Sequence, residues 1–357
     1  MLHYRKQFIT QISAGRVRFG ADARYALADE IAALGCQRAL ILSTASQSSV
    51  AEDIIRLCGA AAAGRFSGAV MHTPVEISER ATDYAKKINA DILVAVGGGS
   101  TIGLSKAIAL RTGLPQIVLP VTYAGSEATA ILGQTENGIK STLTSPLVKP
   151  AVIIYDINLA ATLPLKVAIP SAMNALAHAA EGLYARDNSP LSSLMAVEGL
   201  RAFRKALPRV VEDPEDADAR GEALYGAWLC GSVLGQVGMA LHHKLCHTLG
   251  GSFNLPHAET HSVILPHAIH YNAAAVPERL TPVSEIFANA SPGIALYDFA
   301  KKMAAPLALR DLGLQASDLD RAVEIALAKP YWNPRPVERK PLREMLQAAW
   351  LGERPGG

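Results

Sequence analysis

The sequence lacks several features that mark particular classes of protein. Its 34 Lys and Arg are nearly matched by 32 Asp and Glu, so no charge excess points to a nucleic acid or a membrane surface. No apolar run approaches the roughly 18 residues of a membrane helix. Residues 1–20 also lack the apolar core of a signal peptide. We therefore expect a cytoplasmic protein whose partners include neither nucleic acid nor membrane.

Cysteine and aromatic residues are scarce as well. The four cysteines, Cys36, Cys58, Cys230 and Cys246, are far apart and show no CxxC spacing, so we expect buried thiols in a reducing compartment. Aromatic residues make up only 6% of the chain, which favours helix-rich packing through small side chains. The 357 residues, half of them apolar, suffice for two domains, or one large domain, with an ample core.

The first part of the chain alternates apolar runs with amphipathic segments. Strands are predicted at 38–44, 64–73, 91–97, 115–122 and 150–156, with helices at 48–61, 77–90 and 101–110. Strands that are apolar throughout and alternate with helices indicate a parallel sheet covered on both faces. We predict an α/β domain over residues 1–156.

The pattern changes after Asp156, where long helical stretches replace the strand-like runs. Residues 157–357 are predicted to form an all-helical domain that ends in a frayed tail, with helical stretches at 163–185, 192–213, 219–250, 316–330 and from 337 onward. The sequence contains no apparent internal repeat.

A run of three glycines joins a predicted strand to a predicted helix in VAVGGGSTIGLSKA, residues 94–107. Gly97, Gly98, Gly99 and Ser100 let the backbone approach a phosphate at a helix N-terminus. The motif is not the G-x-G-x-x-G dinucleotide fingerprint, and a simple tight turn is the alternative.

A second polar segment, LPVTYAGSEATAILGQTENGIK at residues 119–140, follows another buried strand. Ligands of open α/β sheets bind at the carboxyl ends of strands. Thr122, Tyr123, Ser126 and Glu127 are therefore candidate ligand contacts beside Gly125, with a plain surface turn as the alternative.

Histidines dominate the third and fourth motifs. In NALAHAAE, Asn174, His178 and Glu181 share one helical face, although a lone helical His is usually structural. Five of the ten histidines lie in ALHHKLCHTLGGSFNLPHAETH, residues 240–261, where His243 and His247 share a face and His257 follows a break. Such residues converge on a divalent cation or on a reacting carbonyl, unless they form a solvated helix.

Together these motifs resemble the iron-containing alcohol dehydrogenase superfamily over nearly the whole chain. Within it, GGGSTIGLSKAIA, AGSEATAILGQTENGIK and LHHKLCHTLGGSFNLPHAETH resemble the maleylacetate reductases. The resemblance implies a dehydroquinate synthase-like architecture, with a Rossmann-like α/β domain that binds a dinucleotide followed by a helical domain. It also implies a homodimer that reduces maleylacetate, a small dicarboxylate, to 3-oxoadipate in bacterial degradation of aromatic compounds.

The metal-dependent relatives hold Fe²⁺ or Zn²⁺ with one Asp and three His. The matching positions here are Asn174, His178, His243 and His257, so the single anionic ligand is missing. Asn binds a hard cation poorly, and we expect no required metal. Three neutral imidazoles do bind Zn²⁺ in some enzymes, which keeps a residual site open.

The resemblance also implies NADH or NADPH as the cofactor. The relatives often carry Asp where this chain has Gly103, and Thr44, Ala45 and Ser46 stand at the end of the first predicted strand. They supply neither a carboxylate to bind a ribose hydroxyl nor an Arg to bind a 2′-phosphate. We expect Thr44 to contact either cofactor, with NADH as the default.

The implied roles of the remaining residues follow from the chemistry of a keto-diacid. His243 and His178 are predicted to polarise the ketone and move a proton, with His247 and His257 close by. Asn174, His242, Lys244 and Lys140 are candidates to meet the substrate. A metal-dependent alcohol dehydrogenase and a nucleotide-binding protein without redox chemistry are the alternatives.

Overall fold

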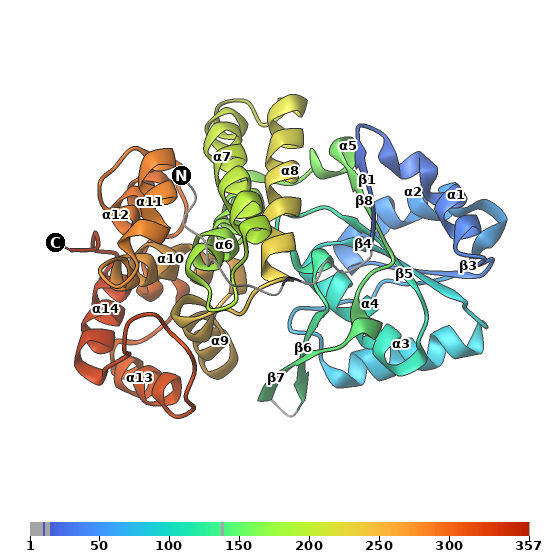
Figure 1. Ribbon diagram of the computed structural model, residues 1–357. Coiled ribbons are helices and arrows are strands. Elements are labelled where there is room, and N and C mark those ends of the chain that lie inside the picture. The colour runs from blue at the N-terminus through green and yellow to red at the C-terminus, as the bar shows by residue number, and fades with distance from the viewer. Residues whose placement is uncertain (1–9, 11–14, 137–138, 357) are drawn as a thin grey trace. The chain divides into compact units, whose positions relative to one another are not determined.

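The computed structural model describes residues 10, 15–136 and 139–356. The chain folds as two compact units, one spanning Ile12–Leu163 and the other Pro164–Gly357, to which Thr10 also belongs. The strands lie in the first unit and the long helices of the second follow from α6 onward (Figure 1). The predicted division after residue 156 falls at the end of the last strand, Val152–Asp156.

A parallel sheet forms the centre of the first unit, as predicted, and it has six strands where five were expected. Its order is β1-β8-β5-β4-β2-β3, with bounds of Arg16–Gly20 (β1), Ala39–Leu42 (β2), Ala62–Phe66 (β3), Ile92–Gly97 (β4), Gln116–Pro120 (β5) and Val152–Asp156 (β8). Strand β1 was not predicted because its RVRFG sequence is half-exposed at the sheet edge and carries two arginines. The predicted strand 64–73 is wrong beyond Phe66, where Ser67 and Gly68 leave the sheet.

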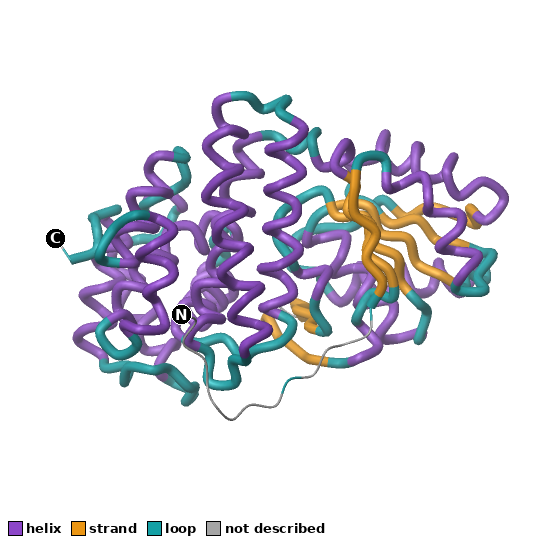
Figure 2. Tube along the Cα trace, turned by 45° about the horizontal axis from the view of Figure 1, so that its top comes forward, coloured by secondary structure: helices purple, strands orange, loops and turns teal. Residues whose placement is uncertain are grey.

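Helices cover both faces of this sheet (Figure 2). Helices α1 (Leu27–Ala33) and α2 (Ser48–Cys58) share a core with strand residues such as Ile41, while α3 (Val75–Lys87) and α4 (Gly99–Thr112) share another with residues such as Leu40. Successive strand residues point to opposite faces, so a strand between two helical layers must be apolar at every position.

An antiparallel hairpin of β6 (Ile131–Glu136) and β7 (Ile139–Thr144) also belongs to the first unit and was not predicted. Its strands carry Gly, Gln, Ser and Lys, which do not give the apolar run used to find the sheet strands. The short helix α5 (Ile157–Ala160) follows β8 and is capped by Asp156.

The second unit is all-helical, as predicted. Its helices are α6 (Leu165–Tyr184), α7 (Pro190–Glu212), α8 (Ala217–Leu234), α9 (Leu241–Phe253), α10 (His257–Ala273), α11 (Pro277–Phe287), α12 (Pro292–Lys302), α13 (Leu319–Leu327) and α14 (Arg339–Leu351). The single helix predicted over 219–250 is wrong, because the GQVGMA segment between α8 and α9 breaks it. The segment contains Gly235 and Gly238, and each glycine destabilises a helix relative to alanine.

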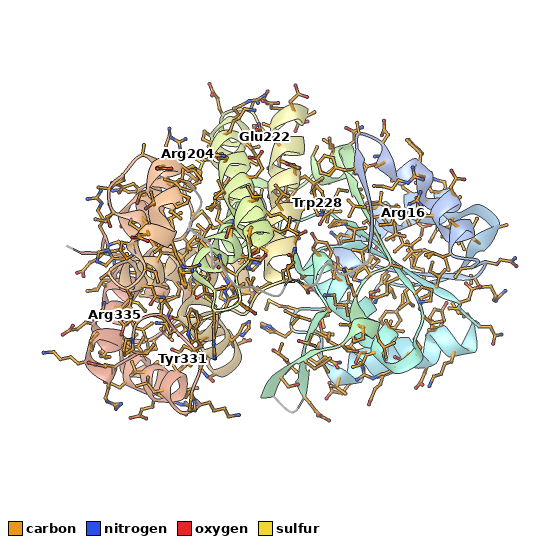
Figure 3. The ribbon with its side chains drawn as sticks, in the orientation of Figure 1. Arg16, Arg204, Glu222, Trp228, Tyr331 and Arg335 are labelled. Atoms are coloured by element: carbon orange, nitrogen blue, oxygen red, sulfur yellow. The ribbon has the colours of Figure 1, made fainter. Side chains whose placement is uncertain are left out.

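Helix contacts in this unit depend on small residues and on aliphatic side chains. Helices α7 and α8 lie side by side, and Figure 3 shows Arg204 on the first and Trp228 on the second. A Cβ added at Gly199 of α7 would lie 2.6 Å from Sγ of Cys230 on α8, so only glycine permits this approach. Helices α9, α10, α13 and α14 share one aliphatic core, which fixes α9 against α10.

Two expectations about the whole chain can be checked on the described residues. None of the four cysteines, all of which the structure describes, is in a disulfide. Among residues 10, 15–136 and 139–356, no helix is both long enough and apolar enough to span a bilayer.

Candidate active site and nucleotide site

The predicted glycine turn joins β4 to α4 in the first unit. A Cβ at Gly97 would lie 2.4 Å from Oγ1 of Thr101, and one at Gly98 would lie 2.8 Å from Cγ2 of Thr122, so close packing excludes side chains at both positions. Around Gly99, by contrast, no atom lies within 4 Å of a built Cβ. The backbone is therefore accessible at the first residue of α4.

The surroundings of this turn fit an anionic, hydrogen-bonding ligand. The N-terminus of α4, including Ser100, offers backbone N–H groups and the positive end of the helix dipole. The hydroxyls of Thr101, Thr122 and Ser126 are buried, yet within the described residues they have no hydrogen-bond partner. Buried hydroxyls are normally paired, so a bound group is the expected partner. The residues present fit a dinucleotide phosphate.

Thr44 lies near the glycine turn. Its Oγ1 donates to Oε1 of Gln47 at 3.2 Å, and the same Oε1 would lie 2.6 Å from a Cβ at Gly97. No carboxylate or guanidinium stands among Thr44, Ala45 and Ser46. Tyr123, also predicted to contact the cofactor, has a fully buried side chain.

A buried lysine that was not predicted fixes the segment after Thr122. Lys106 of α4 donates through Nζ to the carbonyl oxygens of Ser126, Thr129 and Ile131, at 2.6, 2.8 and 2.8 Å. Burial lowers the pKa of Lys106 to about 7, and the nearby Glu127 opposes that shift. Burial likewise raises the pKa of Glu127, whose Oε1 accepts from the Tyr155 hydroxyl at 2.9 Å.

The histidine motifs converge within the helical unit. Helix α6 contributes His178 and Glu181, α9 contributes His242 and His243, and α10 contributes His261. The ring centroids of His178 and His243 are 5.0 Å apart, and that of His261 lies 5.2 Å from His243. Three helices thus supply one cluster of imidazoles.

A hydrogen-bonded chain runs through this cluster from Glu181 to His178. Oε2 of Glu181 lies 2.5 Å from Nδ1 of His243, and Nε2 of His243 lies 2.8 Å from Nδ1 of His178. An ionised carboxylate only accepts, so Nδ1 of His243 carries the hydrogen, and in the neutral ring Nε2 accepts from Nδ1 of His178. This arrangement confirms that His178 and Glu181 share a face of α6.

Glu181 was not among the predicted catalytic residues, although it was placed on the face of His178. Its carboxylate is fully buried and also accepts from the backbone N–H of His242 at 2.9 Å and from the Tyr184 hydroxyl at 3.3 Å. These bonds hold the N-terminus of α9 against α6. The i+3 spacing of Glu181 from His178 was the available signal.

A second imidazole pair lies beside the first. Nε2 of His242 is 2.9 Å from Nδ1 of His261 and 3.7 Å from Sγ of Cys246. Both rings are fully buried. Burial, reinforced by the neighbouring histidines, lowers the pKa of His242 and of His261 well below the usual value, so both stay neutral.

The other predicted site residues of the helical unit belong to the same three helices, α6, α9 and α10. His247 is exposed on α9, 6.2 Å from the His243 ring, and the half-buried His257 ring is 4.4 Å from that of His261. The ammonium of Lys244 lies 5.4 Å from the ring centroid of Tyr331, which is labelled in Figure 3. Asn174 is buried, and its Oδ1 has no partner among the described residues. The side chain of Lys140 lies outside the described part of the structure.

The four positions that match the metal ligands of related dehydrogenases do not fit iron. Asn174 replaces the anionic ligand with a neutral amide, which removes the strongest attraction for a hard cation. Among residues 10, 15–136 and 139–356, the His, Cys, Asp or Glu side chains that lie close enough together to hold an ion are instead His242, Cys246 and His261.

A parallel α/β unit with an open glycine turn and a helical unit with buried imidazoles define a two-domain dehydrogenase architecture. Comparison with known proteins narrows this class. Residues 14–157 match the family described as iron-containing alcohol dehydrogenase, and residues 168–350 match the C-terminal part of the Fe-containing alcohol dehydrogenase family. The chain belongs to the iron-containing alcohol dehydrogenase family and is an oxidoreductase.

Individual relatives cover almost the entire chain. It is 54% identical to a maleylacetate reductase of Rhizobium sp. strain MTP-10005, over 98% of this chain and 99% of that one, and the crystal structure of the Rhizobium protein matches with a TM-score of 0.95. The structure of a maleylacetate reductase from Agrobacterium tumefaciens matches at 53% identity, covering 98% of this chain and all of the other, with a TM-score of 0.95. An iron-containing alcohol dehydrogenase from Corynebacterium glutamicum is 38% identical, with 99% of both chains covered and a TM-score of 0.93.

Proposed function

We propose that this protein reduces maleylacetate to 3-oxoadipate with NADH or NADPH and requires no metal ion. The observation that carries the proposal is the buried Glu181–His243–His178 chain beside Asn174, where metal-dependent relatives have a ligand. The high identity to maleylacetate reductases over the full chain supports the choice of substrate. By the same resemblance, the protein is proposed to form a homodimer.

The reaction makes two demands on the protein. Maleylacetate has a C=C bond next to a ketone, and NADH or NADPH supplies a hydride to the alkene carbon β to that ketone. Negative charge then develops on the ketone oxygen, and a proton must reach the α carbon. The protein has to stabilise the oxygen and deliver the proton.

The Glu181–His243–His178 hydrogen-bonded chain can do both: the extra proton that it carries on Nε2 of His178 first donates to the ketone oxygen and is then proposed to pass to the α carbon, which leaves His178 neutral. Glu181 fixes the tautomer and orientation of His243, as a buried carboxylate does for a catalytic imidazole. When the chain carries an extra proton on His178, both ring nitrogens of His178 are donors, and its Nε2–H is the proposed contact to the ketone oxygen. The negative charge of Glu181 stabilises that imidazolium. This assigns to His178 the acid role that the sequence left undivided among the histidines.

The two substrate carboxylates need cationic or N–H partners. Lys244 is half-buried on α9 and remains the best candidate, while Lys140 stays a prediction. We drop His242, because its ring is fully buried and its Nε2 pairs with His261. Asn174 contributes a neutral amide, which does not repel a dianion as the carboxylate of an Asp would.

Gly97, Gly98, Gly99 and Ser100 would hold the cofactor phosphates at the N-terminus of α4, with Thr122 and Ser126 nearby. The neutral side chain of Thr44 neither repels a 2′-phosphate nor binds it with a charge. Both cofactors are therefore expected to support turnover, with NADH as the default.

One assay with two arms tests the function. Iron and zinc are measured in the purified protein, and NADH oxidation with maleylacetate is followed with and without a chelator. We expect turnover that survives chelation whatever the metal content. Stoichiometric iron or zinc, together with activity that is lost on chelation and restored by the metal, would instead favour a metal-dependent alcohol dehydrogenase. Cofactor binding without NADH oxidation would favour a nucleotide-binding protein.

A further inference from the structure

The second imidazole pair and its cysteine form a set of potential metal ligands of their own. His242 and Cys246 are four residues apart on α9 and so share one face, and His261 reaches them from α10. One ligand atom from each lies within 4.8 Å of the other two. Two of the separations are 2.9 Å, between the His242 and His261 nitrogens, and 3.7 Å, between Nε2 of His242 and Sγ of Cys246.

We propose that His242, Cys246 and His261 bind a thiophilic cation such as Zn²⁺ or Cu⁺. Imidazole and thiolate are the ligands that these ions prefer. Zn–N bonds of about 2.1 Å and Zn–S bonds of about 2.3 Å place tetrahedral ligand atoms roughly 3.3–3.6 Å apart. The observed separations therefore need side-chain shifts on the order of 1 Å to receive the ion.

Hydrogen bonding alone accounts poorly for burying these groups. A neutral imidazole has one donor and one acceptor nitrogen, so a pair of rings presents four nitrogens to satisfy. Nδ1 of His242 and Nε2 of His261 are buried and have no partner among the described residues. The hydrogen bond between the rings thus satisfies only half of the pair. A cation would coordinate the other two nitrogens, Nε2 of His242 and Nδ1 of His261, in place of their hydrogen bond. It would add a bond to Sγ of Cys246, whose thiolate offsets one of its charges.

The proposed site differs in position from that of the metal-dependent relatives. It uses none of the matching residues Asn174, His178, His243 and His257. It links α9 to α10, the helices that carry His243 and His257, and both helices contribute to one aliphatic core. A cation bound by the folded protein and not by the unfolded chain stabilises this part of the fold. The site is structural, so metal-independent turnover does not contradict it.

Cobalt is the probe for this site, because a Co²⁺ ion bound to thiolate gives a near-ultraviolet charge-transfer band that imidazole ligands alone do not give. Co²⁺ is loaded in two ways, by anaerobic titration of chelator-treated protein and by expression in cobalt-supplemented minimal medium. We expect the band to saturate at one equivalent and the Tm to rise on loading. Both effects should persist in Cys230→Ser, whose cysteine is equally buried but lies on α8.

Cys246→Ser should lose the charge-transfer band. His261→Asn should lower the affinity of the protein for Co²⁺ at least tenfold, as measured by titration of that band. The second variant keeps the test decisive if the first does not fold. The proposal is wrong if wild-type protein shows no thiolate band by either loading route, or if the band is undiminished in Cys246→Ser. Because the readout is spectroscopic, failure here leaves the proposed reductase activity untouched.

Discussion

At the scale of single residues, the charge of Glu181 distinguishes His243 from the other imidazoles of the cluster. The carboxylate fixes the tautomer of His243 and supplies the negative charge that an imidazolium at His178 needs. We predict that Glu181→Gln and His243→Ala each lower kcat with maleylacetate by about a hundredfold or more, as expected for loss of acid–base assistance. Steady-state kinetics with NADH provide the measurement.

His270→Asn is the matched control, because His270 is a half-buried histidine of α10 outside the Glu181–His243–His178 chain. It should keep near wild-type turnover. A His243→Ala variant with turnover close to wild type would show that the Glu181–His243–His178 hydrogen-bonded chain has no catalytic role.

Asn174 stands at the position where the metal-dependent relatives have their Asp ligand. An Asp there would restore the Asp and three-His ligand set of the metal-dependent relatives, while bringing a second negative charge close to a dianionic substrate. We predict that Asn174→Asp raises the affinity for Fe²⁺ or Zn²⁺ and lowers kcat/KM for maleylacetate at least about tenfold, since like charges at short range repel. Metal analysis after dialysis and steady-state kinetics check the two parts separately.

Asn174→Leu separates charge from hydrogen bonding. It removes the amide without adding charge, so its metal content should stay at the wild-type level. If Asn174→Asp gained no metal, the missing carboxylate would not explain why these positions fail to fit iron.

At the scale of elements, the periodicity of apolar residues predicted those strands and helices whose burial gives a regular apolar pattern. The buried strands β2, β4, β5 and β8 gave clear apolar patterns, and so did helices such as α2 and α3, which pack one face against the sheet. Helices α1, α10, α11 and α12 were not located from the sequence. The half-exposed β1 and the hairpin β6–β7 gave no such pattern, and the break between α8 and α9 depended on two glycines. The residues of the histidine cluster were likewise predicted only as far as a local pattern reaches. His178, His243 and Glu181 were placed on faces, but pairing across α6 and α9 depends on tertiary packing.

Helix α4 and the segment after Thr122 are linked by Lys106, whose ammonium meets three backbone carbonyls. We predict that Lys106→Met destabilises the protein at pH 8 by about 2–4 kcal/mol, because it leaves buried carbonyls unpaired. Burial lowers the folded-state pKa of Lys106 to about 7, below its unfolded value. Unfolding therefore takes up a proton between pH 7 and the unfolded pKa, so the wild type gains stability as pH rises, by at most about 1.4 kcal/mol per pH unit.

The variant lacks this gain, so its deficit in unfolding free energy relative to wild type should widen from pH 7.5 to pH 9. Denaturant unfolding followed by circular dichroism at several pH values measures it. Lys86→Met on the exposed side of α3 is the control and should change stability by less than about 0.5 kcal/mol. A deficit that narrows as pH rises would contradict the neutralisation of Lys106.

At the scale of the whole molecule, the two units have separate hydrophobic cores and separate proposed tasks. A ligand that binds only the folded state stabilises it by about 2.7 kcal/mol at a hundred times its Kd, and the effect is greatest where the ligand touches the backbone. We therefore predict that NADH slows amide hydrogen exchange at the N-terminus of α4 and in the segment from Thr122 to Ser126. Exchange in α13 and α14 should stay unchanged.

Gly99→Asp tests the assignment, because the position has room for a side chain while a carboxylate there would repel a phosphate. The variant should fold, since an acidic residue suits the first turn of a helix, yet it should lose the protection by NADH. Gly99→Ala adds only a methyl group and should keep most of it. Exchange measured by mass spectrometry on the three proteins, with and without NADH, decides the matter. Equal protection in wild type and Gly99→Asp would mean that the cofactor binds elsewhere, because a carboxylate beside the phosphates cannot be neutral to their binding.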